Sequence, residues 1–178
     1  MKGIIFNVFE QLVARERGEA AWDLLLEDSG LEGAYTSLGS YPDTDLSQLV
    51  EAASAAWDVP ADELVRWLGR EALPLFAQRY PQFFDPHATT AQFLLTLNQI
   101  IHPEVRKLYP GADVPVFDYM VSDHRLTMGY RSVRKLCMFG EGLIEGAAAH
   151  YGETVAIEQP TCMNRGDDRC VLEISFSR

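Results

Sequence analysis

Tyr130-Arg131-Ser132-Val133-Arg134 is the stretch that says most about how this chain folds. In a β-strand successive side chains point to opposite faces, so Tyr130, Ser132 and Arg134 are expected to project from one side. A phenol, a hydroxyl and a guanidinium in a row form a receptor for carboxylates, because a guanidinium binds a carboxylate at two points while hydroxyls donate to its remaining lone pairs. The alternative is a strand whose polar face only meets water.

The pattern on either side of this strand is typical of an α+β protein. Apolar residues at helical spacing predict helices through residues 3–68, through 61–80 with a break near Pro74, and through 89–108. After Pro110-Gly111 the character changes: strands are expected at 114–119, 125–132, 155–158 and 171–176, with a helix at 138–151. Helices followed by a lobe of helix and sheet indicate an α+β architecture.

Composition predicts one globular domain over residues 1–178. The hydrophobic fraction of 47% is enough for a substantial core, and no linker, repeat or low-complexity segment divides the chain. The net charge of −11 argues against nucleic acid as a partner, because phosphate binding needs a basic face.

Nothing in the sequence indicates secretion or membrane insertion. The apolar start of the chain is interrupted by Asn7 and ended by Glu10, and no stretch is long and apolar enough to span a bilayer. Three cysteines are an odd number, which agrees poorly with a secreted disulfide framework. A cytoplasmic protein is expected.

A histidine stands on the apolar side of the third helical region. His102 shares its face with Leu95, Asn98 and Val105, and it is followed by Pro103, which removes a backbone donor and favours a bend. A lone histidine in such a place is usually a hydrogen-bonded core residue. The other reading is a metal ligand, and an axial imidazole together with a carboxylate receptor is what haem b requires.

The joint spacing of these motifs resembles a known family. The opening Met1-Lys2-Gly3-Ile4-Ile5, the His102 helix, Pro115 and Tyr130-x-Ser132-x-Arg134 are similar to the bacterial H-NOX (haem-nitric oxide/oxygen binding) domains, relatives of the haem domain of soluble guanylate cyclase. The resemblance covers essentially the whole chain. It implies a helical N-terminal lobe (1–60) packed on a haem-anchoring lobe (61–178) with a four-stranded antiparallel sheet, and haem between them.

The resemblance also implies roles for individual residues. His102 is expected to be the axial iron ligand, while Tyr130, Ser132 and Arg134 hold the propionates. Ile5 and Pro115 are expected to press on the porphyrin. The distal wall is expected to be entirely apolar, and it is built from Phe9, Phe76, Phe139 and Leu143.

An apolar distal wall predicts which gas binds. Bound dioxygen depends on a hydrogen-bond donor, whereas nitric oxide binds ferrous haem tightly without one. Family members that hold oxygen place a Tyr where this chain has Phe139, so a sensor that binds NO and CO and excludes oxygen is expected. The alternatives are an oxygen or redox sensor, with Tyr80 or Gln78 as donor, or a haem enzyme, which needs a distal acid or base.

The resemblance further implies a signalling mechanism without catalysis. NO weakens the bond between His102 and iron, the lobes rotate, and a separate protein responds. No catalytic module fits within these residues. A histidine kinase or a cyclic-di-GMP enzyme is the expected partner, with its contact near the His102 helix.

Three cysteines suggest a second metal. Cys137, Cys162 and Cys170 resemble a set that binds zinc with a histidine in some H-NOX proteins, but Gln159 occupies the position of that histidine. Three thiolates leave a tetrahedral site incomplete, so structural zinc and a cluster of small buried thiols both remain open.

Overall fold

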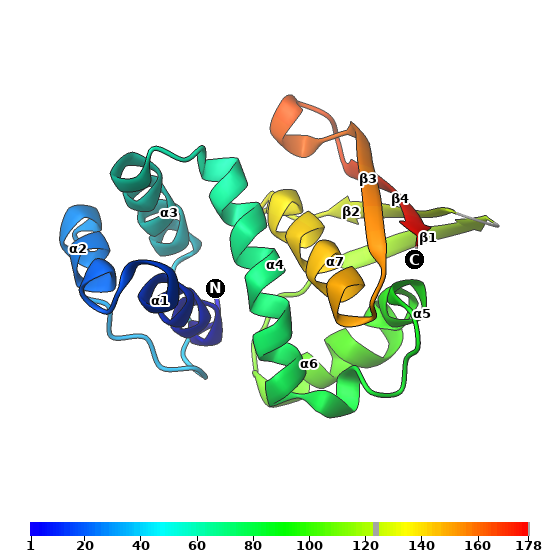
Figure 1. The fold of residues 1–178 in the computed structure, drawn as a ribbon, viewed down its shortest axis with the longest axis horizontal. Helices are drawn as coiled ribbons and strands as arrows, with labels where there is room; N and C mark the ends of the chain where they lie inside the picture. Colours follow the sequence, from blue (N-terminus) through cyan, green and yellow to red (C-terminus); the bar gives the residue numbers. More distant parts are fainter. Residues whose placement is uncertain (123–124, 178) are drawn as a thin grey trace.

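A four-stranded antiparallel sheet and a bundle of helices make up the computed structural model, which describes residues 1–122 and 125–177 (Figure 1). The spatial order of the strands is β1-β2-β4-β3, so β1 and β3 form the edges. In β1 and β2, Phe117 lies opposite Tyr130. The strands are β1 (Val116–Ser122), β2 (Arg125–Arg131), β3 (Thr154–Thr161) and β4 (Cys170–Ser177).

Seven α-helices accompany the sheet in the described part of the chain. Short 3-10 turns lie at Pro81–Phe83 and Met163–Arg165, and a π-helical turn lies at Leu97–Ile101. The α-helices are α1 (Gly3–Arg17), α2 (Ala20–Ser29), α3 (Asp43–Trp57), α4 (Ala61–Arg79), α5 (Thr90–Leu95), α6 (His102–Leu108) and α7 (Cys137–His150). The α+β class expected from the sequence is confirmed.

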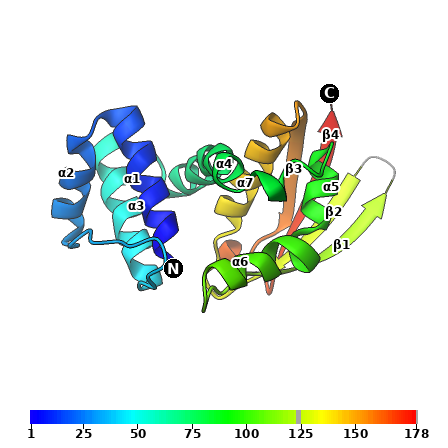
Figure 2. The same ribbon diagram turned by 90° about the horizontal axis from the view of Figure 1, so that it is seen from below.

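Helices α1, α2 and α3 form the N-terminal lobe, which Figure 2 shows to one side of α4. Their apolar stripes meet in one core whose largest fully buried members include Phe6, Phe9, Leu12 and Leu49. The ring of Phe6 stacks on Tyr35 at 4.1 Å between centroids, which fastens the loop after α2 to α1. Burial of these side chains gives the lobe its own hydrophobic interior.

Helix α4 joins this lobe to the rest of the molecule. Leu64 and Leu68 belong to the N-terminal core, whereas Leu73 and Ala77 belong to a second core under the sheet. The division expected at residues 60 and 61 therefore falls at the start of a helix that both cores share.

Helices α4 and α7 cross at very short distance because glycines line their contact. A Cβ on Gly142 would lie 1.9 Å from the carbonyl oxygen of Arg66, and one on Gly69 would lie 2.2 Å from that of Phe139. Small residues let helix backbones approach this closely. The pair forms a rigid support for the side chains that α4 and α7 direct toward the space below them.

Three local expectations are corrected. Pro74 does not break α4, because Leu73 and Ala77 are buried on either side and their packing holds the helix together despite the missing hydrogen bond. The helix expected at 89–108 is divided by the π-helical turn before His102. Strand β2 ends at Arg131, so Ser132 and Arg134 follow the strand and do not share its face.

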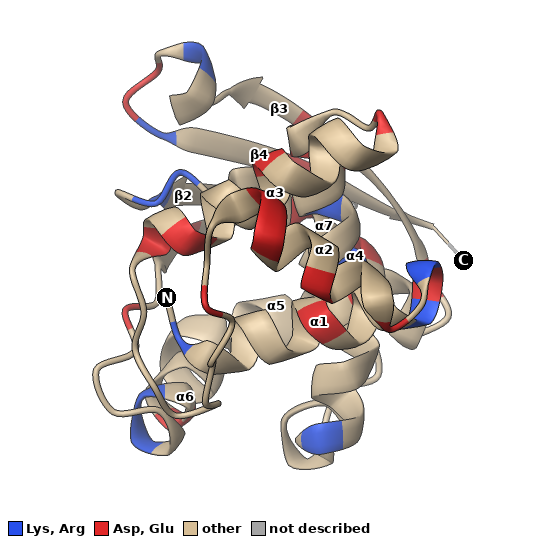
Figure 3. Cartoon of the chain, turned by 90° about the vertical axis from the view of Figure 1, so that its left-hand side faces the viewer, with Lys and Arg blue, Asp and Glu red and all other residues tan. Residues whose placement is uncertain are grey.

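The surface is predominantly acidic. Asp and Glu recur along α1, α2 and α3 on the face shown in Figure 3, in keeping with the net charge of −11. Within residues 1–122 and 125–177, no helix combines the length and the apolarity needed to cross a bilayer.

Candidate functional site

An apolar cavity of about 430 Å³ lies between the two lobes. It is bordered by the start of α1, by α4 and α7, by the segment from Phe93 to Tyr109, and by the first two strands. Nine of the ten residues expected to bind haem line this one space. They are Ile5, Phe76, His102, Pro115, Tyr130, Ser132, Arg134, Phe139 and Leu143.

His102 reaches the cavity from the first turn of α6. Its Nδ1 atom is buried and has no hydrogen-bond partner of good geometry among the described residues. Burial lowers the pKa of the imidazole, and the nearby backbone carbonyl of Pro115 opposes that shift only in part. The ring is therefore neutral at physiological pH, which is the form that binds metals. The core-histidine reading would require a satisfied hydrogen bond at this nitrogen.

Polar groups gather at the mouth of the cavity. The Tyr130 hydroxyl accepts a hydrogen bond from the backbone N–H of Leu136 at 3.1 Å, just before α7 begins. Burial raises the pKa of this phenol, so it stays protonated and able to donate. The Ser132 hydroxyl accepts from the backbone N–H of Arg134 at 3.3 Å. The three side chains thus converge through a turn after β2, where an extended strand was expected.

Arg134 is tied to acidic groups on both sides of the mouth. Its Nε donates to Asp43 Oδ2 at 2.8 Å, and a terminal nitrogen donates to the carbonyl of Asp113 at 2.5 Å. Asp43 lies at the start of α3 and also binds the ammonium group of Met1 at 2.6 Å. Arg134 therefore links the two lobes, and it also lines the cavity between them.

The wall of the cavity is apolar. Ile5, Phe76, Phe139 and Leu143 are only partly buried although they lie inside the fold, because each faces the open space. Pro115 borders the cavity on the same side as His102. Phe9 is the exception among the expected residues. It is 1% exposed within the N-terminal core, edge-on to Trp22 at 5.6 Å, and it does not line the cavity.

Two further phenols border the cavity, and the sequence reading raised one of them as a rival donor. The hydroxyls of Tyr80 and Tyr109 are hydrogen-bonded to each other. Burial raises the pKa of Tyr109 to about 12. Gln78, the other rival donor, is exposed on α4. The hydroxyl of Tyr80 is thus engaged with a neighbour in this structure.

The three cysteines meet as the sequence suggested. Their sulfur atoms lie within 4.8 Å of one another, and Cys137 Sγ is 3.6 Å from Cys162 Sγ. Burial raises the pKa of Cys137 and of Cys170, which favours thiols over thiolates. Metal-ligating side chains within the described residues supply three atoms here and no fourth, since Gln159 is an amide. The arrangement does not complete a zinc site, so the buried-thiol reading is the better one.

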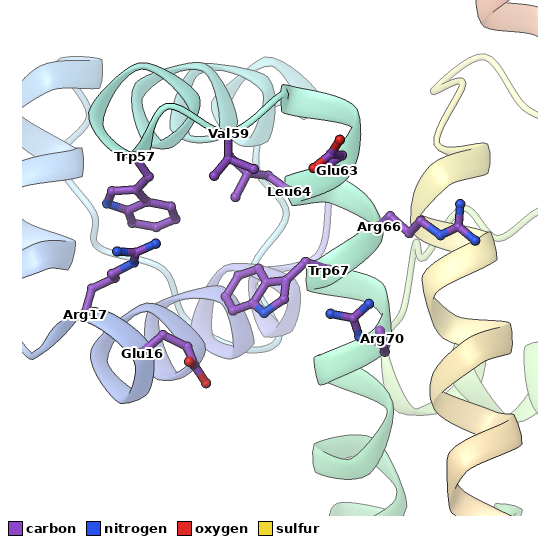
Figure 4. A pocket seen from close by; sticks show the side chains of 9 residues that line it. All are labelled: Glu16, Arg17, Trp57, Val59, Glu63, Leu64, Arg66, Trp67 and Arg70. Atoms are coloured by element: carbon purple, nitrogen blue, oxygen red, sulfur yellow. The ribbon is translucent and has the colours of Figure 1, made fainter. Parts of the chain in front are cut away.

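A second hollow, of about 370 Å³, lies where α1, α3 and α4 meet (Figure 4). Trp57 and Trp67 line it together with charged side chains. The guanidinium of Arg17 lies 5.2 Å from the centre of the Trp57 ring, while Arg66 binds Glu145 at 2.5 Å. It contains no imidazole or thiol, so the chemistry of a metal cofactor belongs to the apolar cavity.

The residues of the apolar cavity fit a haem group. His102 offers a neutral imidazole, the wall offers apolar contact for a porphyrin, and the mouth offers a guanidinium and two hydroxyls for propionates. Fold and cavity together define a haem-binding domain of the α+β class.

Comparison with known proteins agrees with this class. The sequence model of the family described as "Haem-NO-binding" matches residues 2–159. The chain therefore belongs to the haem-NO-binding, or H-NOX, family, whose members are haem-binding gas sensors. No curated protein sequence matches closely enough to count as a relative.

Several solved structures share the fold over at least 94% of their length. An H-NOX protein from S. oneidensis in the Fe(II)NO state is 31% identical, with a TM-score of 0.94 and 100% coverage of both chains. An unliganded Fe(II) H-NOX protein from K. algicida is 31% identical, with a TM-score of 0.90 and coverage of 100% and 97%. An H-NOX from Shewanella woodyi in the Fe(II)CO state is 32% identical, with a TM-score of 0.84 and coverage of 98% and 94%.

The sequence reading missed the acidic partners of the mouth. Asp43 and Asp113 bind Arg134 from distant parts of the chain, 91 and 21 residues away. Asp43 follows Pro42 at a helix start, where an acidic residue is expected for local reasons alone. No local signal marks it as a partner of Arg134.

Proposed function

We propose that this protein is a nitric oxide sensor that carries haem b in the cavity and excludes oxygen. The observation that supports the proposal is the character of the wall: Phe76, Phe139 and Leu143 line the cavity with carbon atoms only and so contribute no hydrogen-bond donor. When bound, ferrous haem supplies the coordination site at which NO or CO attaches, and oxygen there depends on a hydrogen bond.

The remaining work is done by the chain itself. Arg134, Ser132 and Tyr130 hold the propionates at the mouth, and Ile5 with Pro115 presses on the porphyrin. His102 would hold the iron, and a distal ligand that weakened this hold would free α6 to move relative to the N-terminal lobe. Because Arg134 also binds Asp43 in the N-terminal lobe, a change at the haem reaches both lobes. A ligand that favours one of two arrangements shifts their populations.

The signal passes to a separate protein in this proposal. A histidine kinase or a cyclic-di-GMP enzyme is the proposed class of partner. The contact lies beside the His102 helix, where Ile100 and Leu108 are 49% and 42% exposed although both are apolar. Exposed apolar residues next to a moving element suit a regulated contact. Cytoplasmic location and the lack of a nucleic-acid partner stay predictions.

One observation favours an oxygen-binding alternative: the Tyr80 hydroxyl borders the cavity. If it leaves Tyr109, it becomes a donor. A Tyr80→Phe variant distinguishes the readings, because the NO-sensor proposal expects its gas binding to match that of the wild type.

A His102→Ala variant tests the haem assignment itself. We expect it to lose most of its haem, and to regain it when imidazole is supplied, as followed by the absorption band of bound haem. His87→Ala is the matched control, since His87 lies in the loop before α5 and does not line the cavity. Full haem loading of His102→Ala without imidazole would contradict the assignment.

A further inference from the structure

The segment that carries His102 is attached to the sheet by one unusual side chain. Asn98 lies in the π-helical turn Leu97–Ile101, four residues before His102. Its Nδ2 donates to the carbonyl of Phe117 at 2.7 Å, and its Oδ1 accepts from the N–H of Phe117 at 3.0 Å. One side-chain amide thus satisfies both polar groups of one backbone residue.

This contact supplies the hydrogen bonds that a further strand would make at the edge of the sheet. Phe117 lies in β1, an edge strand, and alternate residues of an edge strand direct their N–H and C=O groups outward with no strand to receive them. The amide of Asn98 takes that place at Phe117. A donor and an acceptor held together fix position as well as orientation, which a single bond does not.

Phe117 also touches the imidazole. Its ring centre is 5.6 Å from that of His102 and 6.0 Å from that of Tyr130. The backbone of Phe117 is therefore held by Asn98 while its side chain packs on the proposed iron ligand. Phe117 therefore contacts the π-helical turn at Asn98 and also contacts His102, the residue directly after that turn.

Helix α6 is otherwise held mainly by Val105, which is partly buried and packs against both cores. None of its seven residues, all of which the structure describes, is fully buried. A second tie lies upstream, where the Tyr119 hydroxyl donates to the carbonyl of Leu94 at 2.8 Å. The π-helical turn is itself an irregular element, and such turns often occur at functional sites. Figure 2 shows α5 and α6 beside the β1–β2 hairpin to which these ties connect them.

We propose that Asn98 is a positioning residue, which holds the π-helical turn on β1 and so determines how readily His102 leaves the iron when NO binds. This inference rests on the proposed function. The arrangement with Asn98 bound to Phe117 is the one in which His102 lines the cavity. Loss of the bonds therefore favours the arrangement in which the histidine has left.

Asn98→Ala tests the inference in the haem-loaded, reduced protein. We expect the ratio of histidine-free to histidine-bound NO complex, read from the absorption spectrum, to rise roughly tenfold, because two hydrogen bonds are lost. The iron–histidine stretching band of the unliganded protein should also shift to lower frequency. Asn98→Asp keeps the acceptor and loses the donor, so its effect should have the same direction. An unchanged ratio, or more complete retention of histidine, would overturn the proposal.

Asn7→Ala is the matched control. Asn7 also uses both ends of its amide, donating to the Tyr35 carbonyl at 2.8 Å and accepting from Ser37 at 2.8 Å, but it does so within the N-terminal lobe. If Asn98 acts only through general stability, the two variants will change the NO complex equally, which counts against a positioning role. Hydrogen exchange at the Phe117 amide supplies a direct reading, and it should accelerate in Asn98→Ala alone.

The His102→Ala protein supplied with imidazole separates tethering from other effects. Its ligand is not attached to the turn, so adding Asn98→Ala should leave the NO complex unchanged. If Asn98→Ala changed the NO complex equally in the wild-type background and in the His102→Ala protein with imidazole, the proposal would be overturned. If the wild type bound no haem or no NO, the proposed function would fail first, so the two failures are distinguishable.

Discussion

The mouth and the wall of the cavity differ in almost every physical respect. The mouth is polar and paired: Arg134 is held by Asp43 and Asp113, and the Tyr130 hydroxyl receives a backbone N–H. The wall is apolar, and most of its side chains come from α4 and α7, whose backbones approach closely at glycines, with Ile5 added from α1. The mouth holds the guanidinium and hydroxyl donors that an anionic group requires, while the wall offers only apolar contact beside it. Anchoring a cofactor and choosing its ligand are separate tasks here.

The largest effect is expected from a methyl group added at the α4–α7 contact, which supports the wall. In Gly142→Ala the new Cβ would lie 1.9 Å from the Arg66 carbonyl oxygen, so the helices must separate. We expect a loss of about 3 kcal/mol in the free energy of unfolding, at the upper end for overpacked interiors. Urea denaturation measures it. Gly140→Ala on the same helix meets nothing within 4 Å and should lose none.

A hydroxyl on the wall should change the gas that binds. Phe139→Tyr places a donor in an otherwise apolar space, and a hydrogen bond to a charged acceptor is worth about 1.5–3 kcal/mol. We therefore expect oxygen affinity to rise by roughly 10- to 100-fold, measured as the spectrum of the reduced protein at rising oxygen pressure. Phe139→Leu serves as the control without a donor. If Phe139→Tyr binds oxygen no better than wild type, the wall does not choose the gas.

A change at the mouth should speed the dissociation of haem and leave the preference for NO over oxygen unchanged. Arg134→Leu removes the cation expected to hold a propionate, so haem should dissociate about tenfold faster, the effect of one charge-assisted bond. Transfer of haem to an acceptor protein measures the rate. Arg131→Leu, an exposed neighbour, should behave as wild type. A change in the preference for NO over oxygen would show that mouth and wall are not separate.

The smallest expected effect is the loss of stability at low pH that protonation of Asp43 causes. Burial favours the protonated form of Asp43, but hydrogen bonds from the Met1 ammonium and from Arg134 outweigh it and lower the pKa of this carboxyl. Its contribution to stability is thus present above the unfolded pKa, near 4, and is lost as pH falls through the folded value.

Because the Asp43 side chain is 45% exposed, solvent screens the pair, and the contribution should be below about 1 kcal/mol. Urea unfolding of wild type and Asp43→Asn should differ at pH 6, and the difference should shrink as the pH falls below about 4. A constant difference across that range would mean that the carboxylate charge is not what stabilises the lobes.

Local patterns in the sequence predicted much of this molecule. Helical spacing located the apolar stripe of α1, and period-two alternation located the strands to within a few residues. The convergence of His102 with Tyr130 and Arg134 was predictable because their residue types together suit one cofactor. The family resemblance supplied the wall residues Ile5 and Phe139.

Contacts between distant residues were not predictable. Whether Pro74 breaks α4 depends on burial of Leu73 and Ala77 against partners far along the chain. The end of β2 at Arg131 depends on the turn that lets Arg134 reach Asp43. The bonds from Asn98 to Phe117 join a helical turn to a strand edge, and neither residue signals the other. Such features follow from packing, which a single sequence does not encode locally.

The most direct test of the central claim is the absorption spectrum of the purified, haem-loaded, reduced wild-type protein, recorded under argon, in air and with NO. We expect the spectrum in air, taken before the iron oxidises, to match that under argon, because the wall around Phe139 offers oxygen no donor. With NO we expect a distinct spectrum. A stable oxygen complex in air would contradict the claim that the apolar wall excludes oxygen.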